Sequence, residues 1–235
     1  MNGSAKAQQF GQLRARIEAT FSEPVIIAIT SAARGDGKTS TAFGLAESLA
    51  NAEHRVLFVD ANVEVPTLPR IHRLPNTGGR TDISKVSRYA TVVAGQRFAG
   101  ISFADERLEY GVSMDKVKAA AFDMRSHFDF VVVDTAPLLE SDLAVLFATI
   151  ADGTLVTVRL GRLPLAADVE TMKTLTRVGA KMLGVLTVTS SMVKAFNAQR
   201  EDIIQTIRVP ARHVTTKHSL PPDATREVVE SNSVS

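Results

Sequence analysis

The chain has 235 residues, and its 27 lysines and arginines nearly balance 25 aspartates and glutamates, for a formal net charge of +2. That length suits one α/β domain with a large core, and the charge balance gives no reason to expect nucleic acid as the main partner. The absence of cysteine excludes disulfides and thiol-based sites. Because no apolar run approaches the length of a membrane span and no apolar signal region follows the N-terminus, we expect a cytoplasmic protein that reaches a membrane only through a partner.

The first stretch, from about Ala5 to Phe21, is predicted to be an amphipathic helix. Polar residues separate apolar side chains that recur at helical spacing: Phe10, Leu13, Ile17 and Phe21. Pro24 ends this pattern, and the β-branched run Val25–Ile29 then predicts a buried strand.

The next stretch predicts a phosphate-binding loop. The strand leads into Gly35-Asp36-Gly37-Lys38-Thr39, and a helical pattern follows. Glycines let the backbone turn its N–H groups inward, and the helix directs its positive N-terminal end to the same point. A lysine then serves the outer phosphates and a threonine hydroxyl can hold magnesium. The nucleotide-binding candidates in this loop are Arg34, Gly35, Asp36, Gly37, Lys38, Thr39 and Ser40. Ala32 stands where the general motif has glycine, which marks a subclass.

The rest of the chain alternates between strands and helices. We predict a strand at Arg55–Asp60, a short helix near Asp82–Val86, a strand near Gly100–Ala104, a helix from Val112 to His127, a strand at Phe130–Asp134, a helix near Ser141–Ile150, a strand at Thr154–Val158, a helix at Leu165–Val178, a strand at Met182–Thr189 and a helix near Ala195–Glu201. Such alternation indicates a three-layer α/β sandwich with a mostly parallel sheet. The expected organisation is an N-terminal helix at 1–22, a P-loop NTPase domain at 23–219 and a polar tail at 220–235.

Two strand ends add acidic side chains to the predicted site. Ligands of parallel sheets bind at the carboxyl ends of the strands, and the phosphate loop, Asp60 and Asp134 all fall at that edge. We expect Thr39, Asp60 and Asp134 to hold the metal, and Lys38 and Asp60 to act on the γ-phosphate or the attacking group. The alternative for each aspartate is a cap of the turn that follows its strand. The five histidines show no ligand spacing, so we expect solvated or packing roles for them.

At these residues the chain resembles the bacterial tyrosine kinases (BY-kinases) that regulate capsule and exopolysaccharide export, within the MinD/ParA-like P-loop group. The loop Thr30–Thr39 is similar to the family's Thr-Ser-Ala-x-Pro-Gly-Glu-Gly-Lys-Ser/Thr, with Arg34 at the usual proline. The Asp-x-Asp-x-Arg motif falls on Asp60-Ala61-Asn62-Val63-Glu64, and Asp-x-x-Pro on Asp134 and Pro137. The resemblance implies ATP (or ADP) with Mg²⁺, a membrane-bound polysaccharide co-polymerase or similar activator as partner, and recruitment to the inner face of the membrane. It leaves a homo-oligomer open.

The departures from the family pattern concern charge and base recognition. Asn62 and Glu64 remove one negative ligand and one positive charge beside the phosphates. Val188 stands where the family's adenine-reading asparagine is expected. The signature lysine of the related MinD/ParA class would fall on Ala33 and is missing. The segment around Pro210 is similar to the adenine-side loop of MinD/ParA proteins, which makes Pro210 a further nucleotide-binding candidate.

Other departures concern assembly and the acceptor. Of the N-terminal Glu-x-x-Arg-x-x-Arg implicated in ring assembly, only Arg14 is retained. The two tyrosines, Tyr89 and Tyr110, both precede Asp134, so no tyrosine-rich tail follows the predicted site. Three hypotheses remain: an ATPase or tyrosine kinase, a nucleotide-gated dimerising switch of the MinD/ParA kind, and a scaffold with little turnover.

Overall fold

The fold is described from a computed structural model that places residues 3–66, 83–103, 112–163 and 165–189. In chain order its elements are α1 (Gly3–Thr20), β1 (Val25–Ser31), α2 (Lys38–Asn51), β2 (Val56–Ala61), the 3-10 helix η1 (Ile83–Tyr89), β3 (Thr91–Val92), β4 (Ala99–Ser102), α5 (Met114–His127), β5 (Phe130–Thr135), the 3-10 helix η2 (Leu138–Glu140), α6 (Asp142–Ile150), β6 (Gly153–Arg159), α7 (Ala166–Arg177) and β7 (Met182–Val188).

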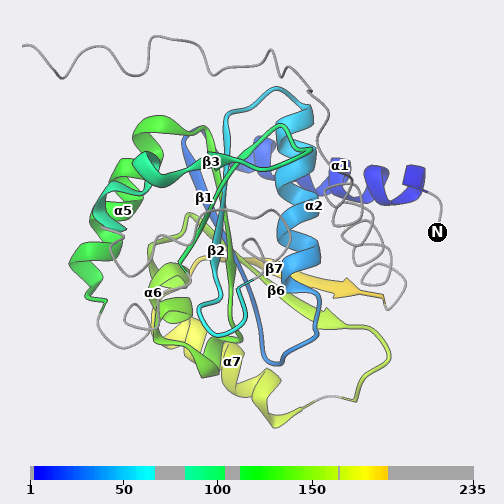
Figure 1. The fold of residues 1–235 in the computed structure, drawn as a ribbon. Helices are drawn as coiled ribbons and strands as arrows, with labels where there is room; N and C mark the ends of the chain where they lie inside the picture. The colour runs from blue at the N-terminus through cyan, green and yellow to red at the C-terminus, as the bar shows by residue number, and fades with distance from the viewer. Residues whose placement is uncertain (1–2, 67–82, 104–111, 164, 190–235) are drawn as a thin grey trace, which may run out of the picture.

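The strands form one seven-stranded sheet in the order β3-β4-β2-β5-β1-β6-β7 (Figure 1). All neighbours pair in parallel except β3 and β4, which are antiparallel. The predicted three-layer α/β sandwich is therefore confirmed. In this order β1 is an interior strand between β5 and β6, so the loop that leaves it has a neighbouring strand on each side.

Side chains of the central strands are buried on both faces, as their continuous apolar runs predict. On one face Ile27 and Ile29 of β1 pack in a core with Leu45 and Leu49 of α2. On the other face alternate residues of β1, β2 and β5 pack beneath η1, α5 and α6. A smaller core joins α6, β6 and α7. The periods of 2 in the strands and 3.6 in the helices thus fix which face each side chain covers.

The N-terminal helix α1 packs on α2 through an aromatic side chain. Phe10 and Ile17 of α1 are buried, and the Phe10 ring lies so close to Gly44 that a Cβ on Gly44 would be 2.3 Å from Phe10 Cε2. The amphipathic pattern of this helix therefore predicts its inward face correctly. A glycine on α2 is what permits the close approach.

The segment after β2, where the sequence pattern is weakest, differs slightly from the prediction. The expected helix near Asp82–Val86 is a 3-10 helix, Ile83–Tyr89, interrupted at Lys85, whose backbone is not helical. Only Ile83 and Val86 of this segment are buried, too few for a regular helical face to form. The short antiparallel strand β3 was not predicted. The expected helix near Ala195–Glu201, Tyr110, Pro210 and the polar tail lie outside the described residues.

Candidate functional site

The β1–α2 loop leaves the carboxyl end of the interior strand β1 and runs directly into a helix N-terminus (Figure 1). Gly35 and Gly37 both have positive φ, +82° and +86°, the left-handed region that favours glycine. The helix begins at Lys38 with the Gly37 carbonyl accepting from Thr41 N at 3.0 Å. The loop thus has the backbone geometry that its glycines predict.

Lys38 is folded back over the loop. Its Nζ donates to Ser31 Oγ at 2.8 Å and to the Ala33 carbonyl at 3.3 Å, and the residue is only 6% exposed. Burial lowers the pKa of Lys38, while the negative charges of Asp134 and Asp36 act in the opposite sense. The ammonium therefore lies at the centre of the loop, where outer phosphates are bound in P-loop proteins.

Asp60 and Asp134 are directly paired neighbours on β2 and β5. Each lies two residues beyond a side chain of the α2-facing core, Phe58 and Val132, so strand alternation turns both carboxylates toward the α2 face. Asp60 accepts from Asn62 N at 3.3 Å and from the Ser102 hydroxyl at 3.5 Å. Its carboxylate therefore also caps the turn after β2, which is the alternative role considered for it.

Asp134 is completely buried, and neither of its carboxylate oxygens has a hydrogen-bond partner among the described residues. Burial raises the pKa of Asp134 to about 7, and repulsion from Asp60 adds to that shift. The nearby Thr39 hydroxyl, which does not meet the geometry of a hydrogen bond here, and the charge of Lys38 oppose it. A buried carboxylate without a partner is rare in a folded protein and calls for an explanation. A role as ligand of a hard cation explains it, because carboxylate and hydroxyl oxygens are the donors that Mg²⁺ prefers. Thr39, Asp60 and Asp134 thus fit a magnesium site.

Asp36, which the sequence places among the nucleotide-binding candidates, has its side chain in an ion pair with the β6–α7 connection. It is 1% exposed and is paired with Arg162, whose Nε lies 2.9 Å from Oδ1 and whose Nη2 lies 3.0 Å from Oδ2. Arg162 also donates to Asp168 of α7. At position 36 only the backbone is available to a ligand, because the Asp36 side chain fixes the loop to the β6–α7 connection. No local pattern indicates this pair, because its members are 126 positions apart.

Arg34 brings a positive charge next to Glu64. The motif analysis predicts that Glu64 removes a positive charge from beside the phosphates. In the structure Arg34 donates to Glu64 and, from Nε, to Glu140 Oε2 at 2.7 Å. A positive charge therefore lies beside position 64, and it comes from Arg34 of the phosphate loop. Asn62, the other altered residue of that motif, accepts from Val65 N at 3.4 Å and so stabilises the turn after β2.

Val188, at the position of the family's adenine-reading asparagine, is buried against the loop. It is 1% exposed, and a Cβ on Gly37 would lie 2.6 Å from Val188 Cγ1. Its side chain therefore supports the loop backbone. Pro210, the other base-side candidate, lies outside the described residues.

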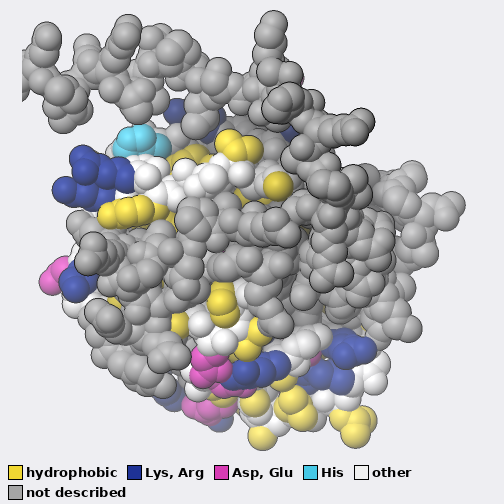
Figure 2. All heavy atoms as spheres, in the orientation of Figure 1, with side chains coloured by type: hydrophobic (Ala, Val, Ile, Leu, Met, Phe, Trp, Pro, Cys, Tyr) yellow, Lys and Arg dark blue, Asp and Glu magenta, His cyan; other side chains and the backbone are white. Residues whose placement is uncertain are grey.

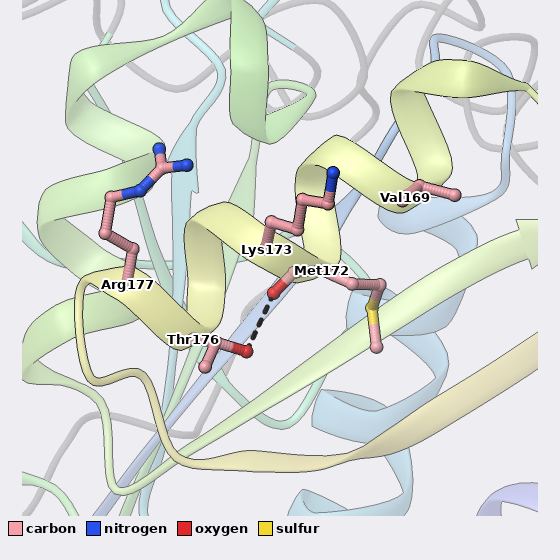
Figure 3. A pocket seen from close by; sticks show the side chains of 5 residues that line it. All are labelled: Val169, Met172, Lys173, Thr176 and Arg177. Carbon is pink, nitrogen blue, oxygen red and sulfur yellow. Dashed lines mark hydrogen bonds between the residues drawn. The ribbon is translucent and has the colours of Figure 1, made fainter.

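Open cavities lie elsewhere on the described part of the chain, and two of them border α7 and α1. One, of about 540 Å³, runs along α7 and is lined by Val169, Met172, Lys173, Thr176 and Arg177 (Figure 3). The other, of about 370 Å³, lies between α1 and the edge strand β7. Neither is lined by the loop lysine or by either site aspartate, so neither is the phosphate site.

A second group of ionisable side chains was missed by the sequence analysis. His54 Nε2 lies 2.9 Å from Glu18 Oε1 and its Nδ1 lies 2.9 Å from Glu23 Oε1. Asp129 is close by but is bound by Arg55 through both oxygens. These residues precede strands, so they lie at the sheet edge opposite the phosphate loop and join α1 to that edge. Histidine spacing in the sequence carries no sign of this cluster.

A mostly parallel sheet with a glycine loop after an interior strand, and two acidic strand ends at the same edge, defines a P-loop type α/β protein. The chain belongs to the CobQ/CobB/MinD/ParA nucleotide binding domain family, whose model matches residues 27–223.

Individual relatives agree with the resemblance to BY-kinases. The chain is 27% identical over 192 residues to tyrosine-protein kinase YwqD of Bacillus subtilis, covering 78% of this chain and 81% of that one. It is 32% identical over 174 residues to the succinoglycan biosynthesis transport protein ExoP of Rhizobium meliloti, covering 70% of this chain but only 22% of ExoP.

Solved structures share the fold at lower identity. The chimerical protein CapA2B2 matches with a TM-score of 0.66 and 22% identity, covering 77% of this chain and 83% of that one. Cobyrinic acid a,c-diamide synthase from Mycobacterium smegmatis, solved with bound ADP and magnesium, matches with a TM-score of 0.59 and 18% identity, covering 78% of this chain and 80% of that one. Among the described residues no helix has the length and apolarity that crossing a membrane requires.

Proposed function

We propose that this chain binds ATP (or ADP) with Mg²⁺ at the β1–α2 loop. Asp134 carries the proposal, because it is a fully buried carboxylate without a hydrogen-bond partner among the described residues, and it is close enough to Lys38 and Thr39 for each to influence its pKa. Lys38 and the loop amides hold the phosphates. Thr39, Asp60 and Asp134 hold the metal, which when bound neutralises phosphate charge.

Lys38 and Asp60 have different proposed roles in binding and in phosphoryl transfer. Lys38 leaves Ser31 and the Ala33 carbonyl for the outer phosphates, which are stronger acceptors. Asp60, held by Asn62 N and Ser102, is positioned at the same edge to orient a metal-bound or attacking oxygen. The segment at Pro210 is a further candidate for contact with the base.

We further propose that the protein regulates exopolysaccharide or capsule assembly or export from the cytoplasm, through a membrane-bound co-polymerase or similar activator. The names of its relatives, a tyrosine-protein kinase and a succinoglycan biosynthesis transport protein, support this. No tyrosine follows Asp134, so we do not expect autophosphorylation on a C-terminal tyrosine cluster in this chain. A nucleotide-gated dimerising switch of the MinD/ParA kind is the second candidate, favoured by the family match and the altered Asn62.

A thermal-shift titration with Mg²⁺–ATP tests the nucleotide proposal. Ligand at about a hundred times Kd adds about 2.7 kcal/mol, roughly 5–10 °C in Tm for a domain of this size. Lys38→Ala should abolish the shift. Lys173→Ala is the matched control, because that lysine is 63% exposed on α7 and should leave the shift unchanged. The absence of any shift at millimolar nucleotide would eliminate the enzyme and switch hypotheses together.

Incubation with Mg²⁺–ATP then separates kinase from switch. Stoichiometric phosphate on Tyr89 or Tyr110 that is lost in Lys38→Ala would identify a working kinase with a relocated acceptor. Nucleotide-dependent dimerisation without phosphotyrosine would support the switch.

A further inference from the structure

One guanidinium connects three segments at the mouth of the phosphate loop. Arg34 lies in the loop after β1, Glu64 lies just beyond β2, and Glu140 lies in η2 beyond β5. Arg34 Nε donates to Glu140 Oε2 at 2.7 Å, and Nη2 donates to Glu64 Oε2. These three side chains are called the Arg34 bridge below. Because β2, β5 and β1 are neighbours in the sheet, the bridge spans the edge at which the proposed nucleotide site lies.

The bridge is close to the loop lysine. Both Glu140 and Arg34 influence the pKa of Lys38, the glutamate raising it and the arginine lowering it, although burial has the largest effect. The face drawn in Figure 2 shows acidic and basic side chains side by side at the end where the β1–α2 loop lies in Figure 1. A terminal phosphate held by Lys38 would therefore meet one guanidinium and two carboxylates nearby.

The bridge is exposed and easily exchanged. The side chains of Arg34, Glu64 and Glu140 are 56%, 49% and 39% exposed, and exposed ion pairs contribute little net free energy. A guanidinium presents a planar fork of donors that matches phosphate oxygens as well as carboxylate oxygens. A bound triphosphate would repel the two glutamates and attract the arginine that they hold.

Resting on the proposed nucleotide function, we propose that Arg34 recognises the terminal phosphate and that Glu64 and Glu140 compete with this phosphate for it. Without nucleotide the glutamates hold the guanidinium. With a triphosphate, Arg34 moves to the terminal phosphate, and the segments that carry Glu64 and Glu140 are released from the loop. A diphosphate lacks the terminal group and leaves the bridge in place. The bridge therefore sets the preference for triphosphate over diphosphate and links it to two neighbouring segments.

The test compares the dissociation constants of Mg²⁺–AMP-PNP and Mg²⁺–ADP on the full chain. Arg34→Gln removes the charge-assisted contact, so AMP-PNP should bind about tenfold more weakly while ADP changes less than twofold. The double variant Glu64→Gln/Glu140→Gln removes the competitors, so AMP-PNP should bind on the order of fivefold more tightly, again with little change for ADP. Glu170→Gln, an exposed glutamate of α7, is the control and should change neither constant.

The decisive result is that the two variants change the affinity for AMP-PNP in opposite directions. A bridge that only holds the segments together would be broken equally in both variants, so both would change AMP-PNP binding in the same direction, and the proposal would be overturned. An unchanged ratio of the two constants in Arg34→Gln would overturn it as well. If the wild-type chain binds neither nucleotide, the proposed function itself fails, which the same titration distinguishes from failure of the Arg34 proposal alone.

Discussion

Asp36 of the phosphate loop and Arg162 of the β6–α7 connection form an ion pair that is almost closed to solvent. The side chains are 2% and 16% exposed, and two nitrogens of the guanidinium meet both carboxylate oxygens, at 2.9 and 3.0 Å. The Arg159 backbone N–H approaches the same carboxylate at 3.4 Å. This pair fixes the acidic residue of the glycine loop to the neighbouring connection and leaves the loop backbone free to face a ligand.

Loss of this arginine should destabilise the fold. Arg162→Ala leaves the Asp36 carboxylate buried without its charge partner, and breaking a buried pair from one side costs about 3 kcal/mol in free energy of unfolding. Urea denaturation measures this loss in the free energy of unfolding. Arg177→Ala is the comparison, because that side chain is 68% exposed and pairs with Glu170 at 3.5 Å, so its loss should cost under about 0.5 kcal/mol. Equal small losses in both variants would show that Asp36 does not depend on Arg162.

Asp168→Asn should destabilise the protein in a way that depends on pH. Hydrogen bonds from Arg162 lower the pKa of Asp168 to about 2. A carboxyl whose pKa is lower in the folded state stabilises the fold above its ordinary pKa near 4 and loses that contribution as the pH falls toward 2.

We expect the difference in unfolding free energy between wild type and Asp168→Asn to be about 1 kcal/mol above pH 5, since the group is partly exposed, and to shrink between pH 4 and 2. Asparagine keeps an acceptor for the Leu165 N–H at the start of α7, so the helix cap is preserved. Denaturation curves across that pH range measure the difference. A difference that stays constant with pH would assign the loss to packing.

Much of this architecture could be predicted from the sequence because it depends on local periodicity and on one compact motif. Apolar β-branched runs predict the strands at Val25–Ile29 and Phe130–Asp134, and a parallel sheet must bring their carboxyl ends to one edge. That rule places Asp60 and Asp134 at the same edge, whereas their direct pairing depends on β2 and β5 being neighbours, which the sequence pattern does not specify.

The ion pairs around the loop could not be predicted in this way. Arg34, Glu64 and Glu140 come from three different connections, and Arg162 meets Asp36 across 126 positions. Periodicity carries no information on which exposed charges meet, because their geometry depends on loop backbones. The 3-10 helix at Ile83–Tyr89 was incompletely predicted because only two of its side chains are buried.

Alanine at the two loop glycines should have unequal effects. Both have positive φ, which costs a residue with a Cβ about 1 kcal/mol. A Cβ at Gly35 meets nothing within 4 Å, whereas one at Gly37 lies 2.6 Å from Val188 Cγ1. Gly35→Ala should therefore lose about 1 kcal/mol, and Gly37→Ala about 1–3 kcal/mol more. A thermodynamic cycle with Val188→Ala should recover the excess for Gly37 but not for Gly35. Equal losses at both glycines would place the whole cost in the backbone.

Asp134→Asn should separate stability from ligand binding. In the wild type two neighbouring carboxylates, Asp60 and Asp134, are both fully buried, and the second has no hydrogen-bond partner among the described residues. Replacing Asp134 by a neutral amide removes their repulsion, so in EDTA the variant should unfold at the same temperature as the wild type or a few degrees above it. With Mg²⁺–ATP the order should reverse, because only the wild type keeps the carboxylate that fits the metal, and the wild type alone should gain roughly 5–10 °C. Thermal unfolding of both proteins in EDTA, in Mg²⁺ and in Mg²⁺–ATP measures this reversal. A variant that is several degrees less stable in EDTA, yet gains as much from Mg²⁺–ATP as the wild type, would make Asp134 a structural residue and remove the magnesium assignment.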